Sequence, residues 1–278
     1  MLTFWKMNGA GNDFVMVDNR DGSVSLEGRQ IEHLCDRHRG IGADGLLAVE
    51  PARNGADFRM RYYNADGGEA EMCGNGARCF AKFVRFLNGE ADMDFVTFET
   101  IAGQINATFS GDDVCINLSD PFDLELDASL EANGVTRIVH SVNTGVPHAV
   151  VVVDDLEAVE VVEEGAALRH HDRFAPKGTN VNFMQVLEPG RLAIRTYERG
   201  VEDETLACGT GMVANAIVHH QLSAAPPPVT VRVKSGETLS VGFEVHTGAN
   251  GEPKYKNVTL TGAADIVYKG EIELIEAI

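Results

Sequence analysis

The sequence is poor in cysteine, in tryptophan and in positive charge. Among its 278 residues are 5 cysteines and 1 tryptophan, and 23 lysines and arginines stand against 42 aspartates and glutamates, for a formal charge of −19. An odd and sparse set of cysteines does not make a disulfide scaffold in a chain of this length. The negative charge repels nucleic-acid backbones and anionic lipid surfaces, so we expect neither as a partner.

Long apolar runs are absent as well. No stretch of about 18 apolar residues occurs, which predicts that no helix spans a membrane. The first residues do not join a basic segment to an apolar one, so we expect no signal peptide and interpret the chain as a cytoplasmic protein with reduced thiols. Hydrophobic residues make up 44% and charged residues 23%, which is typical of globular proteins with one large or two smaller domains.

The chain repeats one pattern. Residues 62–79, YYNADGGEAEMCGNGARC, resemble residues 197–214, YERGVEDETLACGTGMVA, and each segment contains a Cys-Gly-x-Gly turn. The cysteines of the two turns lie 208 − 73 = 135 residues apart, close to half the chain. The same spacing separates the other matching pairs, which are Tyr62 and Tyr197, Gly74 and Gly209, and Gly76 and Gly211. The sequence therefore predicts two halves of related structure.

Each half is predicted to be α+β, with a β-rich layer wrapped around one central helix. Alternating side chains predict strands at residues 58–63 and 192–197, ahead of the two turns. Apolar side chains at helical spacing predict that a central helix follows Cys73 and that another follows Cys208. The two halves are therefore expected to be pseudo-symmetric.

Two further helices and the domain boundaries complete the expected architecture. One helix is predicted at residues 26–38, with Ser25 as its N-cap, and the other at residues 155–169. The expected boundaries are 1–125 for the N-terminal α/β half, 126–265 for the C-terminal α/β half, and 266–278 for a C-terminal strand that returns to the first half.

A cysteine just before a helix is well placed for acid–base chemistry. The first N–H groups of a helix have no partner within it and the helix dipole is positive there, so a thiolate or a carboxylate ligand is stabilised. Two such cysteines can act on opposite faces of one carbon, because a thiolate can remove a proton while a thiol returns one. We therefore interpret Cys73 and Cys208 as an acid–base pair.

The remaining cysteines fit structural roles. Cys35, Cys79 and Cys115 are interpreted as core residues, which is what most cysteines are. The spacing of Cys73 and Cys79 does not suit a zinc site, so we expect no metal. No phosphate-binding glycine loop accompanies a suitable Schiff-base lysine, so we expect no pyridoxal phosphate or other cofactor.

Six motifs make the sequence similar to the diaminopimelate epimerase family. They are KMNGAGNDF at residues 6–14, NADG at 64–67, EMCGNGARC at 71–79, GTNVNF at 178–183, YERG at 197–200 and ACGTG at 207–211. The resemblance covers nearly the whole chain. It implies two pseudo-symmetric halves with the active site in the cleft between them. It also implies the cofactor-independent interconversion of LL- and meso-2,6-diaminopimelate, on the route to lysine and peptidoglycan.

The resemblance implies roles for individual residues. Cys73 and Cys208 match the two catalytic thiols, with Cys208 as the base and Cys73 as the acid in the LL-to-meso direction, and His148 and Glu198 resemble residues that tune these thiols. The residues that match substrate ligands are Asn12, Asn64, Gly74, Asn75, Asn180, Glu198, Arg199, Gly209 and Thr210. Tyr268 matches a position linked to dimer formation, so a homodimer is expected.

The sequence departs from the family at two positions. Asp44 stands where some members carry an amide, and Val146 stands before Pro147 where many members carry asparagine. Because Val146 cannot form a hydrogen bond through its side chain, contacts to the far end of a substrate must differ or come from the backbone.

Three other functions are weighed against this one. A proline or hydroxyproline racemase of the same fold also uses paired cysteines, whereas a non-catalytic amino-acid-binding protein needs no matched thiols. A thiol redox protein would give Cys73 or Cys208 a close cysteine partner in a C-x-x-C motif. The asparagines and the Glu198–Arg199 pair favour a substrate with a second charged amino-acid end, which diaminopimelate has.

Overall fold

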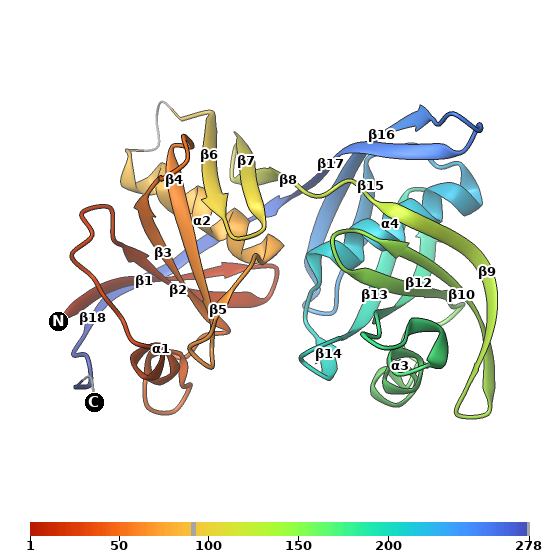
Figure 1. Cartoon of the computed structure of the whole chain (residues 1–278), viewed down its shortest axis with the longest axis horizontal. Coiled ribbons are helices and arrows are strands. Elements are labelled where there is room, and N and C mark those ends of the chain that lie inside the picture. The colour runs from red at the N-terminus through yellow and green to blue at the C-terminus, as the bar shows by residue number, and fades with distance from the viewer. Residues whose placement is uncertain (90–92, 277–278) are drawn as a thin grey trace. The chain divides into compact units, whose positions relative to one another are not determined.

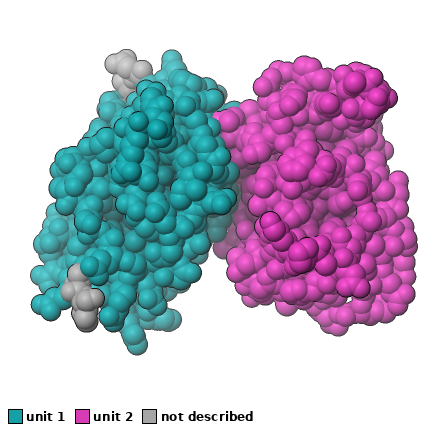
Figure 2. Space-filling view, viewed as in Figure 1, with its two compact units in different colours: residues 1–116, 262–278 teal, residues 117–261 magenta. Residues whose placement is uncertain are grey.

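The chain divides into two compact units. A computed structural model describes residues 1–89 and 93–276 (Figure 1). Unit 1 consists of residues 1–116 and 262–278, and unit 2 consists of residues 117–261 (Figure 2). Unit 1 therefore combines the beginning of the chain with its end.

Unit 1 is a mixed sheet with two helices. Its strands are β1 (Leu2–Gly9), β2 (Asn12–Asp18), β3 (Gly45–Pro51), β4 (Phe58–Asn64), β5 (Glu69–Ala70), β6 (Phe95–Thr100), β7 (Gly103–Ser110), β8 (Asp113–Asn117) and β18 (Asp265–Ile272), and its helices are α1 (Gly28–Cys35) and α2 (Gly74–Leu87). The strands pair in the order β18-β1-β2-β3-β4-β6-β7-β8, and β5 pairs with the end of β4. The pairs β2–β3 and β4–β6 are parallel, and the others are antiparallel.

Unit 2 has the same arrangement. Its strands are β9 (Phe122–Ala132), β10 (Val135–Asn143), β11 (Pro147–Val152), β12 (Asn180–Glu188), β13 (Arg191–Glu198), β14 (Asp203–Thr205), β15 (Val229–Arg232), β16 (Thr238–Thr247) and β17 (Pro253–Ala263); its helices are α3 (Val161–Arg169), the 3-10 turn η1 (Asp172–Phe174) and α4 (Gly209–Ser223). The order is β9-β10-β11-β12-β13-β15-β16-β17, and β14 pairs with the end of β13. Again only the third and fifth pairs, β11–β12 and β13–β15, are parallel. The predicted duplicated α+β fold is confirmed, and β18 occupies in unit 1 the place that β9 occupies in unit 2.

The central helices α2 and α4 form the middle of the two units. Helix α2 contacts β1, β2 and β3 and also β7, so strands from both ends of the order surround it; α4 likewise contacts β10 to β13 together with β15 and β16. In Figure 1 each helix lies among the strands of its own unit. Every residue of α4 from Gly211 to His219 is buried, which explains why apolar residues lie on all sides of this helix.

The smaller helices cover the other face of each sheet. Ile31 and Leu34 of α1 pack with Val15 and Leu46 of the paired strands β2 and β3. In unit 2, Leu168 of α3 belongs to one apolar cluster with Phe183, Val151 and Tyr197 of the sheet. The central strands are therefore buried on both faces, and a polar side chain on the inner face of such a strand must find its partners inside the protein.

Two predicted helix starts were wrong. Helix α1 begins at Gly28 with Glu27, and not Ser25, as its N-cap, because Gln30 reaches back to the Glu27 amide and completes a capping box. The helix predicted at 155–169 begins at Val161. The Asp155 carboxylate accepts a hydrogen bond from the Glu157 amide, and this local turn competes with helix formation.

The pairing of the strands shows that the predicted match of Tyr62 with Tyr197 is off by one residue. Leu47 of β3 and Asn182 of β12 are equivalent, because each lies two residues beyond the first pair of its parallel ladder. Tyr62 lies opposite Leu47, whereas Thr196, and not Tyr197, lies opposite Asn182. The connection from β13 to Cys208 is therefore one residue longer than the connection from β4 to Cys73.

The packing of unit 2 predicts a large loss of stability for Phe183→Ala. Phe183 is fully buried in the cluster between β12 and α3, so truncation leaves a cavity and should lower the free energy of unfolding by about 3–5 kcal/mol. The control is Phe122→Ala, since the Phe122 side chain is 53% exposed and its truncation should cost about 0.5 kcal/mol or less. Urea denaturation followed by circular dichroism measures both, and equal losses would contradict the packing described.

Candidate functional site

Both cysteines of the repeated turns are N-cap residues of the central helices. Cys73 precedes α2 with φ −134° and ψ 123°, and Cys208 precedes α4 with φ −125° and ψ 110°. The first amides that bond back into each helix are those of Ala77, to Cys73 O at 2.7 Å, and Met212, to Cys208 O at 2.9 Å. The N–H groups of the first turn, which include those of the predicted ligand positions, are thus available for an anion.

The third residue of each helix lies very close to the strands beneath it. A Cβ atom on Gly76 would lie 3.3 Å from Leu47 Cδ1 and 3.4 Å from Phe14 Cζ. A Cβ atom on Gly211 would lie 2.5 Å from Asn182 Oδ1. In unit 2 this approach of the turn to the sheet requires glycine, whereas in unit 1 a Cβ atom would be tightly packed against the ends of two side chains.

A chain of hydrogen bonds lies behind Cys208. The Sγ atom of Cys208 is 3.5 Å from Thr210 Oγ1, which is 3.0 Å from His148 Nε2. The Nδ1 atom of His148 is 3.1 Å from Asn182 Nδ2. Burial, together with the nearby charge of Arg199, lowers the pKa of His148 to about 3, so its ring is neutral over the physiological range.

Other predicted residues of unit 2 meet at the adjoining strand ends. Asn180 lies opposite His148 in the parallel ladder, and its Oδ1 accepts a hydrogen bond from the Arg199 amide at 2.8 Å. Glu198 ends β13, and burial raises the pKa of its carboxyl. Protons can therefore be held at this carboxyl closer to neutral pH than at an exposed glutamate.

In unit 1 the predicted ligands Asn12 and Asn75 are joined. The Nδ2 of Asn75 donates to Asn12 Oδ1 at 2.6 Å, and Asn12 Nδ2 donates to Asp44 Oδ2 at 2.8 Å. Asp44 also accepts from Arg37 at 2.8 Å, so its negative charge is paired. Asn64, the remaining ligand predicted in this unit, is the last residue of β4.

A partly buried group of three charged residues adjoins this asparagine pair. Lys6 lies 2.8 Å from Asp13, whose other oxygen is 2.7 Å from Arg37. Burial by itself would raise the pKa of Asp13, but hydrogen bonds and charge from Arg37 and Lys6 outweigh it and lower the pKa to about 2. Sequence analysis missed Lys6, Asp13 and Arg37. Lys6 and Asp13 stand in one motif on the paired strands β1 and β2, but nothing in the sequence shows that Arg37, which follows α1, joins them.

Sequence analysis also missed Asn182. It stands within the motif 178–183, yet it was assigned no role. The sequence around it gave no signal, because Asn182 alternates with Val181 and Phe183, a pattern that places a polar side chain toward solvent, whereas the structure buries all three residues. A buried amide in such a strand needs internal hydrogen-bond partners, and His148 is one of them.

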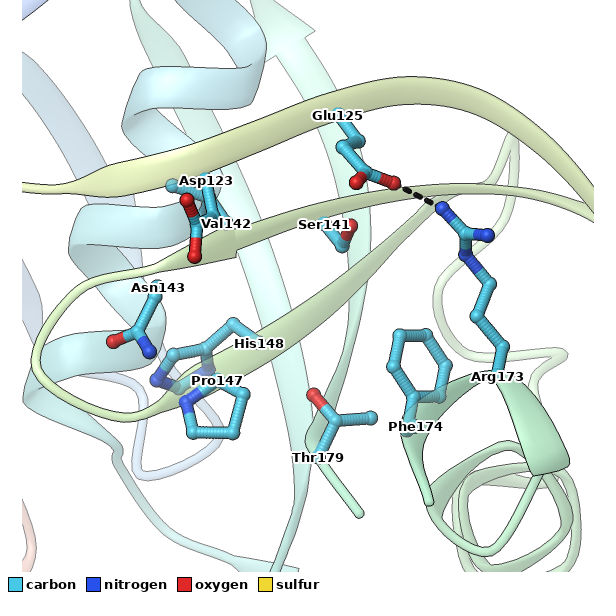
Figure 3. Close-up of a pocket in the computed structure, with 10 residues that line it drawn as sticks. All are labelled: Asp123, Glu125, Ser141, Val142, Asn143, Pro147, His148, Arg173, Phe174 and Thr179. Carbon is cyan, nitrogen blue, oxygen red and sulfur yellow. Dashed lines mark hydrogen bonds and ion pairs between the residues drawn. The ribbon is translucent and has the colours of Figure 1, made fainter. Parts of the chain in front are cut away.

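A cavity of about 280 Å³ in unit 2 has His148 among its lining residues (Figure 3). Asp123, Ser141 and Thr179 are among its lining residues, and an ion pair between Arg173 and Glu125 lies at one side of it. Cys208 does not line this cavity. We assign it no ligand.

The five cysteines, all of which the structure describes, form no disulfide bond with one another. Across residues 1–89 and 93–276, no group of three His, Cys, Asp or Glu side chains is placed to hold a metal ion. None of the helices in that part of the chain is long and apolar enough to cross a membrane.

Comparison with known proteins gives consistent results. The family model "Diaminopimelate epimerase" matches residues 4–120 and 140–255. The chain is 42% identical over 270 residues to diaminopimelate epimerase of Chlorobaculum tepidum, which covers 96% of this chain and 100% of that protein. It is 41% identical over 285 residues to diaminopimelate epimerase of Aquifex aeolicus, which covers 98% of both.

Solved structures share the fold at low identity. A Bacillus anthracis phenazine biosynthesis protein of the PhzF family aligns with a TM-score of 0.74 at 15% identity and covers 98% of this chain and 99% of that one. A hydroxyproline epimerase from Agrobacterium vitis aligns with a TM-score of 0.71 at 21% identity and covers 98% and 90%. At these identities the likeness concerns the fold alone.

The ion pair behind Asn12 predicts a change in acid stability for Asp13→Asn. Because the pKa of folded Asp13 is below its ordinary value of 3.8, its contribution to stability is present above about pH 4 and is lost as the pH falls toward 2. Asp13→Asn should therefore be less stable than the wild-type protein at pH 7. Between pH 4 and pH 2 its free energy of unfolding should fall by less than that of the wild-type protein. Denaturation at several pH values measures this, with Asp112→Asn as control because that side chain is 96% exposed. An unchanged acid slope in Asp13→Asn would contradict the assignment.

Proposed function

The chain belongs to the diaminopimelate epimerase family, and we propose that this isomerase interconverts LL- and meso-2,6-diaminopimelate by a two-base mechanism in which Cys73 and Cys208 are the paired thiols. One observation carries the mechanism. The two cysteines are the N-caps of the two equivalent central helices, in units whose strands pair in the same order.

The proposed reaction needs two proton transfers at one carbon. In the LL-to-meso direction the Cys208 thiolate takes the α-proton and becomes a thiol, and the electron pair left on the carbon takes a proton from Cys73 on the opposite face, which leaves Cys73 as the thiolate. In the reverse direction the roles exchange. Since the thiols carry both transfers, the proposed mechanism needs no cofactor.

The helix starts supply the electrostatic part of the mechanism. We propose that the N–H groups of Gly74, Asn75, Gly209 and Thr210 bind the α-carboxylate of the reacting centre. Two helix N-termini aimed at this carboxylate stabilise the negative charge that develops on the carbanion. His148 and Glu198 are proposed to tune the thiols.

The remaining polar side chains are proposed to bind the far amino-acid end of the substrate. Arg199 can hold a carboxylate with two parallel hydrogen bonds, and Glu198 can accept hydrogen bonds from an ammonium group. Asn12, Asn64 and Asn180 would complete the set. The paired charge of Asp44 suits this role, because an unpaired carboxylate would repel the substrate carboxylate.

The pathway and the cellular setting follow from the reaction. We propose a place in the synthesis of lysine and of peptidoglycan precursors, for which meso-diaminopimelate is the building block. A cytoplasmic location is proposed because reduced thiols are needed for the chemistry.

The mechanism predicts isotope exchange without an added cofactor. In heavy water the wild-type enzyme should place deuterium at the α-carbon of LL-diaminopimelate and form the meso isomer, as measured by NMR and chiral chromatography. Cys73→Ala and Cys208→Ala should each lower epimerisation by about 10²–10⁴-fold or more, the usual contribution of one acid or base. Cys115→Ala, which changes a cysteine on β8, serves as the control.

Three outcomes would count against the proposal. Full epimerisation by both alanine variants would remove the thiols from it. Turnover of proline or hydroxyproline at a higher kcat/KM than diaminopimelate would favour the racemase alternative, and binding without exchange would favour a non-catalytic binding protein.

We also propose that the enzyme is a homodimer in which Tyr268 lies at the interface. Tyr268 is on β18, and with Val267 it forms an exposed apolar pair, 46% and 59% exposed. Tyr268→Ala should shift the equilibrium from dimer toward monomer in analytical ultracentrifugation. Phe95→Ala, which changes an aromatic residue of the same unit that is 52% exposed, is the control. A monomeric wild-type protein would refute the proposal.

A further inference from the structure

The two helix starts rest on side chains of different character. In unit 1 the third helical residue, Gly76, lies against Phe14 and Leu47. In unit 2 the equivalent residue, Gly211, lies against Asn182. The same fold therefore places an apolar surface under the start of α2 and a polar side chain under the start of α4.

The strand register shows that these side chains are equivalent. Phe14 and His148 each belong to the first pair of a parallel ladder, β2–β3 in unit 1 and β11–β12 in unit 2. Leu47 and Asn182 each lie two residues beyond that pair on the partner strand. Unit 1 thus shows that this fold can be built with two apolar residues, so packing does not require a histidine and an asparagine in unit 2.

The hydrogen bonds of Asn182 fix the orientation of its amide. Its Nδ2 is 3.0 Å from the carbonyl oxygen of Ala149, which can only accept, so the NH₂ group must lie on that side. Its Oδ1 accepts from the Thr196 hydroxyl at 3.0 Å. The second hydrogen of Nδ2 then points to His148 Nδ1 at 3.1 Å. Every polar atom of this buried amide is used.

The orientation of Asn182 determines the tautomer of His148. Because Nδ1 accepts a hydrogen bond from the amide, it carries no hydrogen, and the neutral ring must carry its hydrogen on Nε2. Nε2 is 3.0 Å from Thr210 Oγ1, so the ring donates to that hydroxyl. The hydroxyl hydrogen of Thr210 is then directed away from the ring, and Cys208 Sγ lies 3.5 Å from the oxygen.

We propose that Asn182 is a positioning residue for the reaction: it holds His148 in the Nε2–H tautomer, so that consecutive hydrogen bonds run from Asn182 through His148 and Thr210 to the sulfur of Cys208 and stabilise its thiolate. We call these four residues the Cys208 relay. The importance of Asn182 for catalysis rests on the proposed function. The hydrogen bonds of the relay are a property of unit 2 alone. It assigns the resting thiolate to Cys208 and gives His148 the role of a hydrogen-bond donor, not of a base that deprotonates the thiol.

Charged groups near the relay act in addition to it. His148 on β11 is kept neutral by burial and by the positive charge of Arg199, the residue that follows β13. Glu198, next to Arg199, is the neighbouring carboxyl, and burial raises its pKa. Both charged residues remain in all the variants below, so differences between variants report the relay.

The first test measures the tautomer directly. In the full-length protein labelled with ¹⁵N-histidine, His148 should give the two-bond coupling pattern of a neutral ring with hydrogen on Nε2 throughout pH 6 to 8. The resonance is assigned by its loss in His148→Gln. A hydrogen on Nδ1, or a doubly protonated ring in this range, would overturn the proposal.

The second test measures the Cys208 thiolate in a Cys73→Ser background. Thiolate absorbance is titrated against pH, with a Cys73→Ser/Cys208→Ser protein as the blank. Asn182→Leu, which copies Leu47 of unit 1, should raise the pKa of Cys208 by about one unit, as expected for loss of a hydrogen bond to a charged group. Thr210→Val should raise it by a similar amount, while Thr210→Ser, which keeps the hydroxyl, should leave it unchanged.

The double variant separates a relay from general damage. If Asn182 acts through Thr210, Asn182→Leu combined with Thr210→Val should shift the Cys208 pKa no further than the larger single change. Additive shifts, or an Asn182→Leu protein that is less stable but has an unchanged pKa, would overturn the proposal. Should Asn182→Leu fail to fold, the tautomer measurement and the Thr210 pair still decide it.

The same variants in the enzyme with Cys73 intact link the relay to turnover. The acidic limb of the kcat/KM profile should move to higher pH by the shift measured for the thiol. The titration uses no substrate. A protein whose Cys208 titrates as expected but which does not epimerise diaminopimelate would therefore refute the proposed function and leave the relay intact. An enzyme that epimerises diaminopimelate, but whose Cys208 pKa is the same in the variants, would refute the relay and leave the proposed function intact.

Discussion

The close approach of each central helix to its sheet is the constraint on which the rest of the structure depends. The third residue of the helix is glycine in both units, and a Cβ atom there would meet a strand side chain at 3.3 Å in unit 1 and 2.5 Å in unit 2. Pressed against the sheet in this way, the first turn holds its N–H groups and its N-cap cysteine in a fixed place. The proposed anion site and the proposed reactive sulfur therefore lie at the same point of each unit.

How much could be read from the sequence depended on how local each feature is. The Cys-Gly-x-Gly turns and the helices after them were predicted because a few neighbouring residues determine where a helix starts. The start of α1 was misplaced by only a few residues, since Ser25 and Glu27 can both cap a helix and the choice was made by Gln30. The returning strand was expected from position and pattern, and β18 pairs with β1 along its length.

Features that join distant segments could not be predicted in this way. Lys6, Asp13 and Arg37 meet because β1, β2 and the segment after α1 come together, which spacing along the chain does not show. Asn182 was missed for another reason. A polar residue in an alternating strand is normally assigned to the solvent side, and only the presence of α4 over that face shows that its amide is buried and must be satisfied. Duplication then makes the difference from Leu47 informative, because one half serves as the reference for the other.

The order in which the polypeptide is synthesised gives the strand arrangement a further consequence. Unit 2 is continuous, whereas unit 1 lacks β18 until the chain has been translated through residue 272, although β1 is made before all of unit 2. During translation β1 therefore has one edge without its partner, and exposed edges of this kind recruit other strands. The half that is translated first must be the last to be completed, and a chain that ends before β18 would carry a complete second half beside an open, aggregation-prone first half.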